Sequence, residues 1–204
     1  MFNNIFCQFN KIIFSNYNNL DICIRTNNEY NQKYLKYYKY SSFNNSVNKL
    51  PKNITHIIFG EFFNQLVDNL PSNIIYLIFG CYFNQSVDNL PPNITYLTFG
   101  MDFNQPVNLL PPNIKYLTFG FYFNQPVDNL PTNIIHLTFG CNFNQSVEYL
   151  PNGIIELTFG MHFNQSLDLI PNSVKKIILP KESYFNQSLD CLSKSVKIEY
   201  IYDD

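Results

Sequence analysis

Residues 123–142 read FNQPVDNLPTNIIHLTFGCN, and the fold follows from this unit because close copies of it fill most of the chain. Each copy opens on a Phe-Asn pair, and successive pairs are twenty residues apart until the last, which comes two residues late. A period of this length is typical of a solenoid, in which successive coils stack on one another. The opening phenylalanines are Phe43, Phe63, Phe83, Phe103, Phe123, Phe143, Phe163 and Phe185.

The second half of each copy predicts a short β-strand. Ile, Tyr and Phe favour extended backbone, and their alternation places Leu77 and Phe79 inward and Tyr76 and Ile78 outward. Gly80 then recurs at the same point of other copies, which predicts a corner that needs either a positive φ or a close backbone approach. The Leu-Pro-x-Asn step predicts a turn and leaves little room for a helix.

Two amide side chains also recur in register, an Asn and then a Gln directly after the opening Phe. Amides carry both donors and acceptors, so stacked copies favour a ladder in which each amide bonds the backbone or the next coil. We expect this column to lie inside the solenoid. The predicted structural ladder consists of Asn64, Asn84, Asn104, Asn124, Asn144 and Asn164.

The pattern FNQPVDNLPxNIxxLTFG closely resembles the FNIP repeat, a relative of the leucine-rich repeats. Ile74, Leu77 and Phe79 look like the three apolar positions of the leucine-rich strand motif. The ladder asparagine departs from that motif, because Asn84 comes five residues after Phe79, where the motif has three. The resemblance implies an all-β, leucine-rich-repeat-like solenoid of about eight coils, and it supplies no catalytic residues.

FNIP proteins are known mainly from amoebae and from the giant viruses that infect them, and some carry an F-box-like N-terminal segment that recruits ubiquitin ligases. Residues 1–42 lack the Leu-Pro opening and the helical spacing of such a segment. We expect them to form an N-terminal cap or a docking segment, because the ends of a repeat array must be covered. Residues 43–192 form the predicted solenoid, and residues 193–204 a C-terminal cap strand with an acidic tail.

Charge and cysteine usage restrict the partners and the compartment. The net charge is −2, with 13 basic and 15 acidic residues, so neither nucleic acid nor an anionic membrane is a default partner. No basic start followed by an apolar stretch indicates secretion. The five scattered cysteines favour free thiols in a reducing compartment, and we expect a cytoplasmic protein, in the host cytoplasm if it is viral.

The outward strand positions are the candidate binding residues. Tyrosines supply large contact area at low entropic cost, and threonines line the neighbouring column. The alternative is a solvated sheet of β-prone residues paired with their like. The predicted partner-binding residues are His56, Tyr76, Tyr96, Tyr116, His136, Glu156, Thr98, Thr118 and Thr138.

Other chemistry has weak support in the sequence. An acidic column runs from Asp68 to Asp190, but without the glycine-rich calcium-loop pattern we expect a solvated turn face and no bound metal. No nucleophile–base constellation or cofactor motif is evident, so we expect neither an enzyme nor a cofactor. The leading hypothesis is a non-catalytic, monomeric protein-interaction module with an unknown protein partner. The alternatives are a structural or self-assembling scaffold element and a substrate-recognition adaptor for a ubiquitin ligase.

Overall fold

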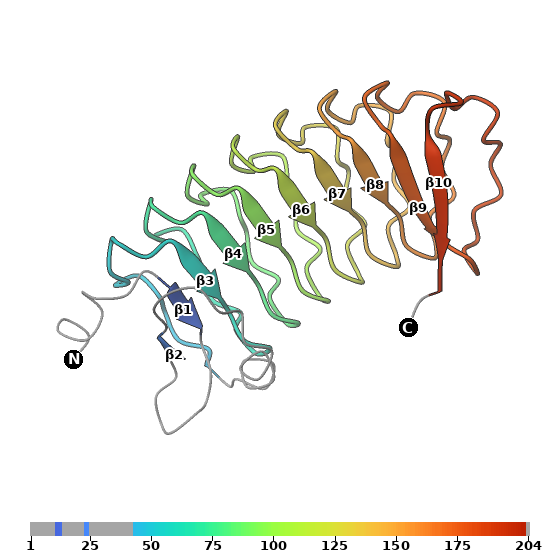
Figure 1. The fold of residues 1–204 in the computed structure, drawn as a ribbon. Coiled ribbons are helices and arrows are strands. Elements are labelled where there is room, and N and C mark those ends of the chain that lie inside the picture. Colours follow the sequence, from blue (N-terminus) through green and yellow to red (C-terminus); the bar gives the residue numbers. More distant parts are fainter. Residues whose placement is uncertain (1–10, 14–22, 25–42, 203–204) are drawn as a thin grey trace.

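The computed structural model describes residues 11–13, 23–24 and 43–202. The strands among these residues form one continuous sheet that is parallel except for one antiparallel pair, and none of these residues is helical (Figure 1). Its strands are β1 (Lys11–Ile13), β2 (Cys23–Ile24), β3 (His56–Ile58), β4 (Tyr76–Ile78), β5 (Tyr96–Thr98), β6 (Tyr116–Thr118), β7 (His136–Thr138), β8 (Glu156–Thr158), β9 (Lys176–Pro180) and β10 (Lys197–Ile201).

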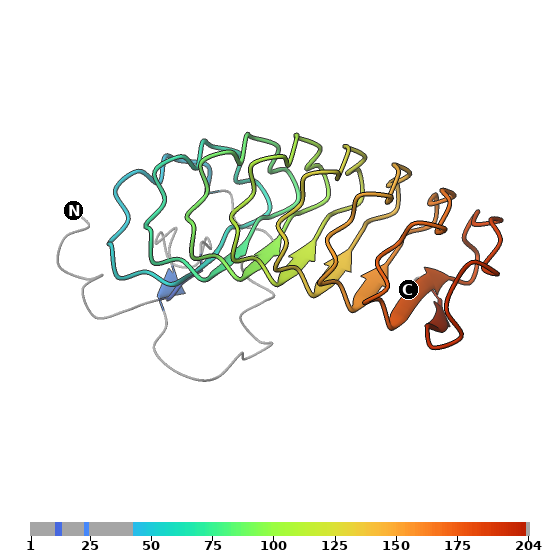
Figure 2. The ribbon, with the colours of Figure 1, turned by 90° about the horizontal axis from the view of Figure 1, so that it is seen from above.

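Each strand from β3 to β9 pairs in parallel with the strand of the next coil, and the register from β3 to β9 is twenty residues throughout. Like residues therefore stand side by side: Tyr76 pairs with Tyr96, and Leu77 with Leu97. The strands form one side of the row of coils, and turns form the other (Figure 2). The all-β, leucine-rich-repeat-like solenoid that the repeat predicts is confirmed.

The core is a column of identical layers. The alternation predicted for the strand is confirmed, because Leu77 and Phe79 are buried while Tyr76 and Ile78 are only half-buried. Phenylalanine rings stack continuously through the core, and the centroids of Phe79 and of Phe83, which opens the next copy, are separated by 3.8 Å. In one coil the buried set consists of Phe63, Val67, Leu70, Ile74, Leu77 and Phe79.

The recurring glycine marks a close backbone approach. A β-carbon on Gly120 would lie 1.8 Å from the carbonyl oxygen of Gly100, and at Gly80 the corresponding distance to the Gly60 oxygen is 2.0 Å. No side chain fits such a space. Of the two explanations that the sequence left open, the close approach holds, since none of these glycines has a positive φ.

The row of coils is curved, with the strands on its inner side (Figure 2). Hydrogen-bonded strands are about 4.8 Å apart. The separation between ring centroids is larger in the core, 5.6 Å for Phe79 and Phe99 and 6.1 Å for Phe83 and Phe103, which come after the corner. Coils that are spaced more widely away from the strands must bend the stack toward the sheet.

The two ends of the stack carry additional strands. At one end β1 pairs in parallel with β3, and β2 pairs antiparallel with β1. At the other end β10 pairs in parallel with β9, with Ile198 opposite Ile177. These strands extend the sheet beyond the repeat. Most of the predicted N-terminal cap or docking segment, residues 1–42, lies outside the described part of the chain, so the adaptor hypothesis stays untested.

Candidate functional site

Five neighbouring rings follow one another along the concave face, and we call them the aromatic column; all are stacked except Tyr96 and Tyr116, whose planes are tilted by 31°. Neighbouring ring centroids are separated by 5.5, 4.4, 5.9 and 5.0 Å along the column. The parallel register produces this stack, because it places each ring beside the equivalent ring of the next coil. The column consists of His56, Tyr76, Tyr96, Tyr116 and His136.

Stacking determines which part of each ring faces solvent. Tyr116 is 43% exposed and the His136 side chain is 39% exposed, whereas the other rings are half-buried because neighbouring rings cover their faces. The ring edges therefore face outward. Beside them runs the threonine column, which is also half-buried and brings small β-branched side chains to the same face; it consists of Thr98, Thr118, Thr138 and Thr158.

Charged side chains replace the rings toward the C-terminal end. Glu156 lies 3.9 Å from His136 and 3.4 Å from the Lys176 ammonium. Lys176 also contacts Glu199 at 2.8 Å, and Lys197 contacts the same carboxylate at 2.6 Å. Hydrogen bonds from Lys176 and then from Lys197 lower the pKa of Glu199 to about 2. The candidate residue Glu156 thus belongs to a charge network, whereas the tyrosines carry no charge.

The predicted asparagine ladder is present, and it works as a row of acceptors. The side-chain oxygen of Asn84 accepts the backbone N–H of Asn104 at 3.0 Å and the Nε2–H of Gln105 at 3.0 Å. The same pattern repeats in the other coils. The expectation of an internal column was wrong: Asn84 is half-buried and Asn124 is exposed, because the ladder lies just beyond the corner.

A second asparagine row precedes the strands, although the Leu-Pro-x-Asn pattern predicts only a turn at this point. Asn93 donates its Nδ2–H to the carbonyl oxygen of Ser72 at 2.9 Å. Equivalent bonds tie the other members to the preceding coil. Recurrence of Asn after Leu-Pro-x was the signal that would have revealed it. This donor row consists of Asn73, Asn93, Asn113 and Asn133.

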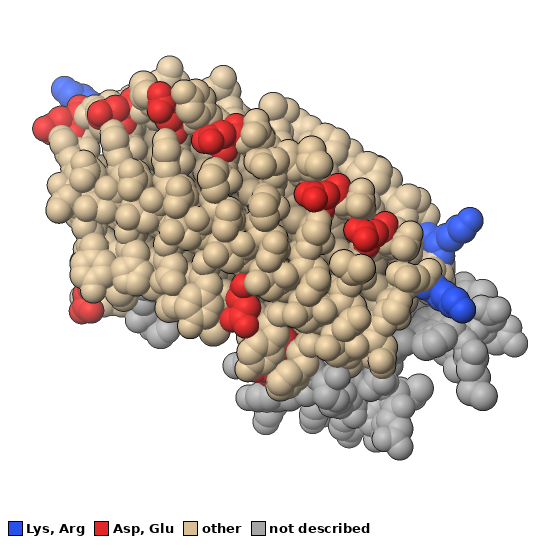
Figure 3. Space-filling model, turned by 180° about the vertical axis from the view of Figure 1, so that it is seen from behind, with Lys and Arg blue, Asp and Glu red and all other residues tan. Residues whose placement is uncertain are grey.

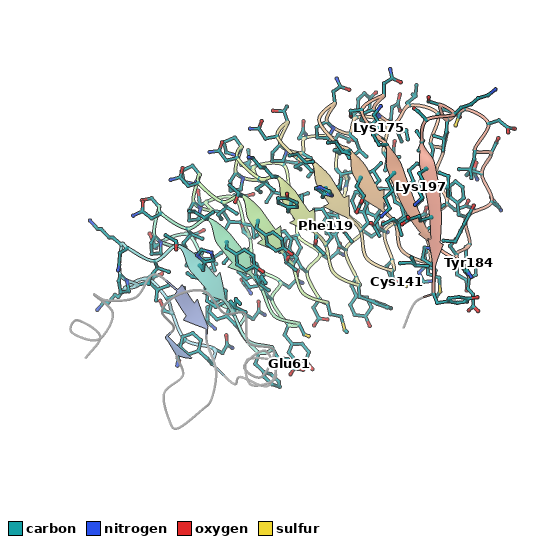
Figure 4. The ribbon with its side chains drawn as sticks, viewed as in Figure 1. Glu61, Phe119, Cys141, Lys175, Tyr184 and Lys197 are labelled. Atoms are coloured by element: carbon teal, nitrogen blue, oxygen red, sulfur yellow. The ribbon has the colours of Figure 1, made fainter. Side chains whose placement is uncertain are left out.

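The second residue after each glycine lies on an exposed or half-buried corner, which we call the rim: Phe62, Tyr82, Asp102, Tyr122, Asn142 and His162. Phe62 and Tyr82 are each 45% exposed, and their rings are 5.2 Å apart. Figure 4 shows Glu61 and Cys141 along this end of the strands, with Lys175 at the opposite end.

The acidic column follows the back of the molecule, where all its members are exposed. It forms a line of acidic side chains along one edge in Figure 3. Within the described ranges, no group of three or more His, Cys, Asp or Glu residues is placed to hold a metal ion. His56 and His136 stand at opposite ends of the aromatic column, and His162 lies on the rim beside Asn142, 3.1 Å from its side-chain oxygen.

The sequence profile of the FNIP repeat matches five segments that together run without a gap through residues 43–182. The chain belongs to the FNIP repeat family. No curated protein matches the chain at a significant level. Among the part of this FNIP protein that the structure describes, no helix is long and apolar enough to cross a membrane.

A solved structure resembles this FNIP protein over most of its length. It is CroV588, a giant-virus protein whose crystal structure is described as a novel circular leucine-rich-repeat structure. The sequences are 40% identical, the TM-score is 0.71, and the match covers 78% of the present chain. The present chain spans only 26% of CroV588.

Proposed function

We propose that this FNIP protein is a non-catalytic protein-interaction module whose partner binds the concave face. The aromatic column carries the proposal, because three successive tyrosines present uncharged ring edges over neighbouring coils. Aromatic side chains dominate binding energy at protein interfaces. The residues proposed to bind the partner are His56, Tyr76, Tyr96, Tyr116, His136, Glu156, Thr98, Thr118 and Thr138.

The stacking favours a protein over a carbohydrate or a cationic ligand. Sugars and cations engage the faces of aromatic rings, but here the faces lie against neighbouring rings. Ring edges are electropositive and favour contacts with ring faces and carbonyl oxygens. A protein surface supplies both groups.

The test is capture from an amoebal lysate with the wild-type chain and with a variant that combines Tyr76→Ser, Tyr96→Ser and Tyr116→Ser. A control variant with Tyr149→Ser and Tyr184→Ser removes exposed tyrosines away from the column. We expect a partner that the control retains and the column variant loses, with circular dichroism unchanged in both. Equal capture by all three proteins would refute binding at the column.

A second candidate function is that of a self-assembling scaffold element, and it is favoured by the edge of β10 that pairs with no other strand among the described residues. The Ile201 carbonyl accepts a hydrogen bond from the Lys181 N–H, so the peptide groups of Tyr200 face away from β9. Tyr200 and Ile201 are both exposed. Light scattering over a wide concentration range should show association that Tyr200→Pro abolishes, whereas a constant monomer mass would exclude this function.

A further inference from the structure

A groove of about 650 Å³ runs along the flank of the solenoid where the chain enters the strands. One wall is the donor row, and the other is the column of residues that follows it by two positions. That column is continuous, because Thr95 donates its N–H to the Ile75 carbonyl and Lys115 to the Thr95 carbonyl. The groove is lined by Thr55, Asn73, Ile75, Asn93, Thr95, Asn113, Lys115 and Asn133.

The groove offers hydrogen-bond donors at regular intervals. Each amide nitrogen of the donor row has two hydrogens, and one of them bonds the preceding coil, as in Asn113 to the Pro92 carbonyl at 2.9 Å. Within the described part of the chain, the second hydrogen of Asn93 or Asn113 has no acceptor. The four asparagines are exposed, so a ligand in the groove can reach these side chains.

The spacing of these donors selects a backbone conformation. Coils on this flank follow the strands at about 4.8 Å, so two coils span about 9.6 Å. A polyproline II helix repeats every three residues, or about 9.3 Å, and leaves its carbonyl oxygens free of internal hydrogen bonds. An extended strand repeats every two residues, or about 6.8 Å, which does not match the spacing of the coils. An α-helix repeats every ~5.4 Å and has no free carbonyl oxygens to accept the donors.

The charge of the groove selects the side chains. Lys115 is exposed and is the one charged residue among those that line the groove. Proline has no backbone N–H, so the backbone of a proline-rich segment can accept hydrogen bonds but cannot donate them. We propose that the groove is a second binding surface, separate from the aromatic column, for a proline-rich polyproline II segment with an acidic residue opposite Lys115.

Fluorescence anisotropy of the full chain with labelled nonapeptides tests this proposal. PPPPEPPPP is the probe, and GSGSEGSGS has the same length and charge without the polyproline II conformation. We expect saturable binding of the first below about 1 mM and much weaker binding of the second. No binding of PPPPEPPPP, or equal binding of both peptides, would overturn the proposal.

Two further measurements locate the site. Lys115→Glu should weaken PPPPEPPPP binding by about three- to tenfold, whereas Lys194→Glu, an exposed change at the far end, should leave it unchanged. In an NMR titration the side-chain amides of Asn93 and Asn113 should shift. Shifts confined to Tyr96 and Tyr116 would refute the groove. The triple tyrosine variant should keep peptide binding, so that failure at one surface is distinguishable from failure at the other.

Discussion

The carbonyl oxygen of Gly100 lies 1.8 Å from the point where a β-carbon on Gly120 would be. The same approach recurs at successive corners, which explains why the repeat has glycine there without any positive φ. Gly153 differs, because its β-carbon would meet the Thr132 oxygen at 3.0 Å, which needs only a small adjustment.

We predict that Gly120→Ala destabilises the protein by roughly 3 kcal/mol or more, because two backbone segments must separate to admit the methyl group. Gly153→Ala should change stability by less than about 1 kcal/mol, since lower unfolded-state entropy offsets a modest contact. Urea denaturation followed by circular dichroism measures both. Similar midpoints for the two variants would contradict the close-approach explanation.

The two asparagine rows differ in the atom that they use. In the ladder, the Asn104 oxygen accepts from the Asn124 N–H at 2.9 Å and from Gln125 at 3.2 Å. In the donor row, Asn113 uses its nitrogen, which bonds the Pro92 carbonyl. Aspartate keeps the oxygen and loses the nitrogen, so it separates the two roles.

We therefore predict opposite tolerance to aspartate at neutral pH. Asn104→Asp should retain most of the stability, because the carboxylate still accepts both bonds, whereas Asn104→Ala should cost about 1–2 kcal/mol. Asn113→Asp should lower the free energy of unfolding at least as much as Asn113→Ala does, since it places a carboxylate oxygen against the Pro92 carbonyl oxygen. Thermal melts of the four variants test the assignment. Equal losses for both aspartate variants would show that the rows do not differ in this way.

Among the elements, the last strand depends on charge more than the others do. β10 pairs with β9, but Tyr200 and Ile201 are exposed and the Phe stack ends at Phe185. Lys176 and Lys197 both bond Glu199, which joins the strand to its neighbour across the concave face. The sequence was enough to predict a C-terminal cap strand within residues 193–204, but it did not reveal this network.

We predict that acid loosens β10 before the rest of the sheet. The pKa of Glu199 is about 2 in the folded chain, below its ordinary value of 4.5. A lowered pKa means that the stabilisation is complete above 4.5 and is lost as pH falls toward 2. An NMR titration of the Lys181 amide, which bonds the Ile201 carbonyl, follows the strand. Glu199→Gln should remove this pH dependence; an unchanged titration would exclude Glu199 as its source.

On the scale of the whole molecule, every coil is stabilised by its neighbours. The ring of Phe123 stacks on Phe103 and Phe143 at 6.1 Å and on Phe119 at 3.8 Å. Phe185 at the end of the stack is only half-buried and stacks on Phe163 at 6.0 Å. In such arrays stability is a sum over coils and their interfaces.

We predict that Phe123→Ala lowers the free energy of unfolding by about 3–5 kcal/mol, because it opens a cavity between two interfaces. Phe185→Ala should lower the free energy of unfolding by about half as much or less, since solvent already reaches the ring. Equilibrium denaturation gives both values. A terminal variant as damaging as the central one would contradict the additive description.

The period, the strands, the inward and outward positions and the presence of an amide ladder were all predictable from the sequence, because they follow from the residues of one coil. The sequence also identified the tyrosines and threonines that share the concave face. The exposure of the ring edges, the amide atom that each asparagine uses in its hydrogen bonds and the groove beside the donor row are evident only in the folded stack. These features depend on contacts between coils, and the separation of adjacent coils is set by the whole stack and not by any one copy.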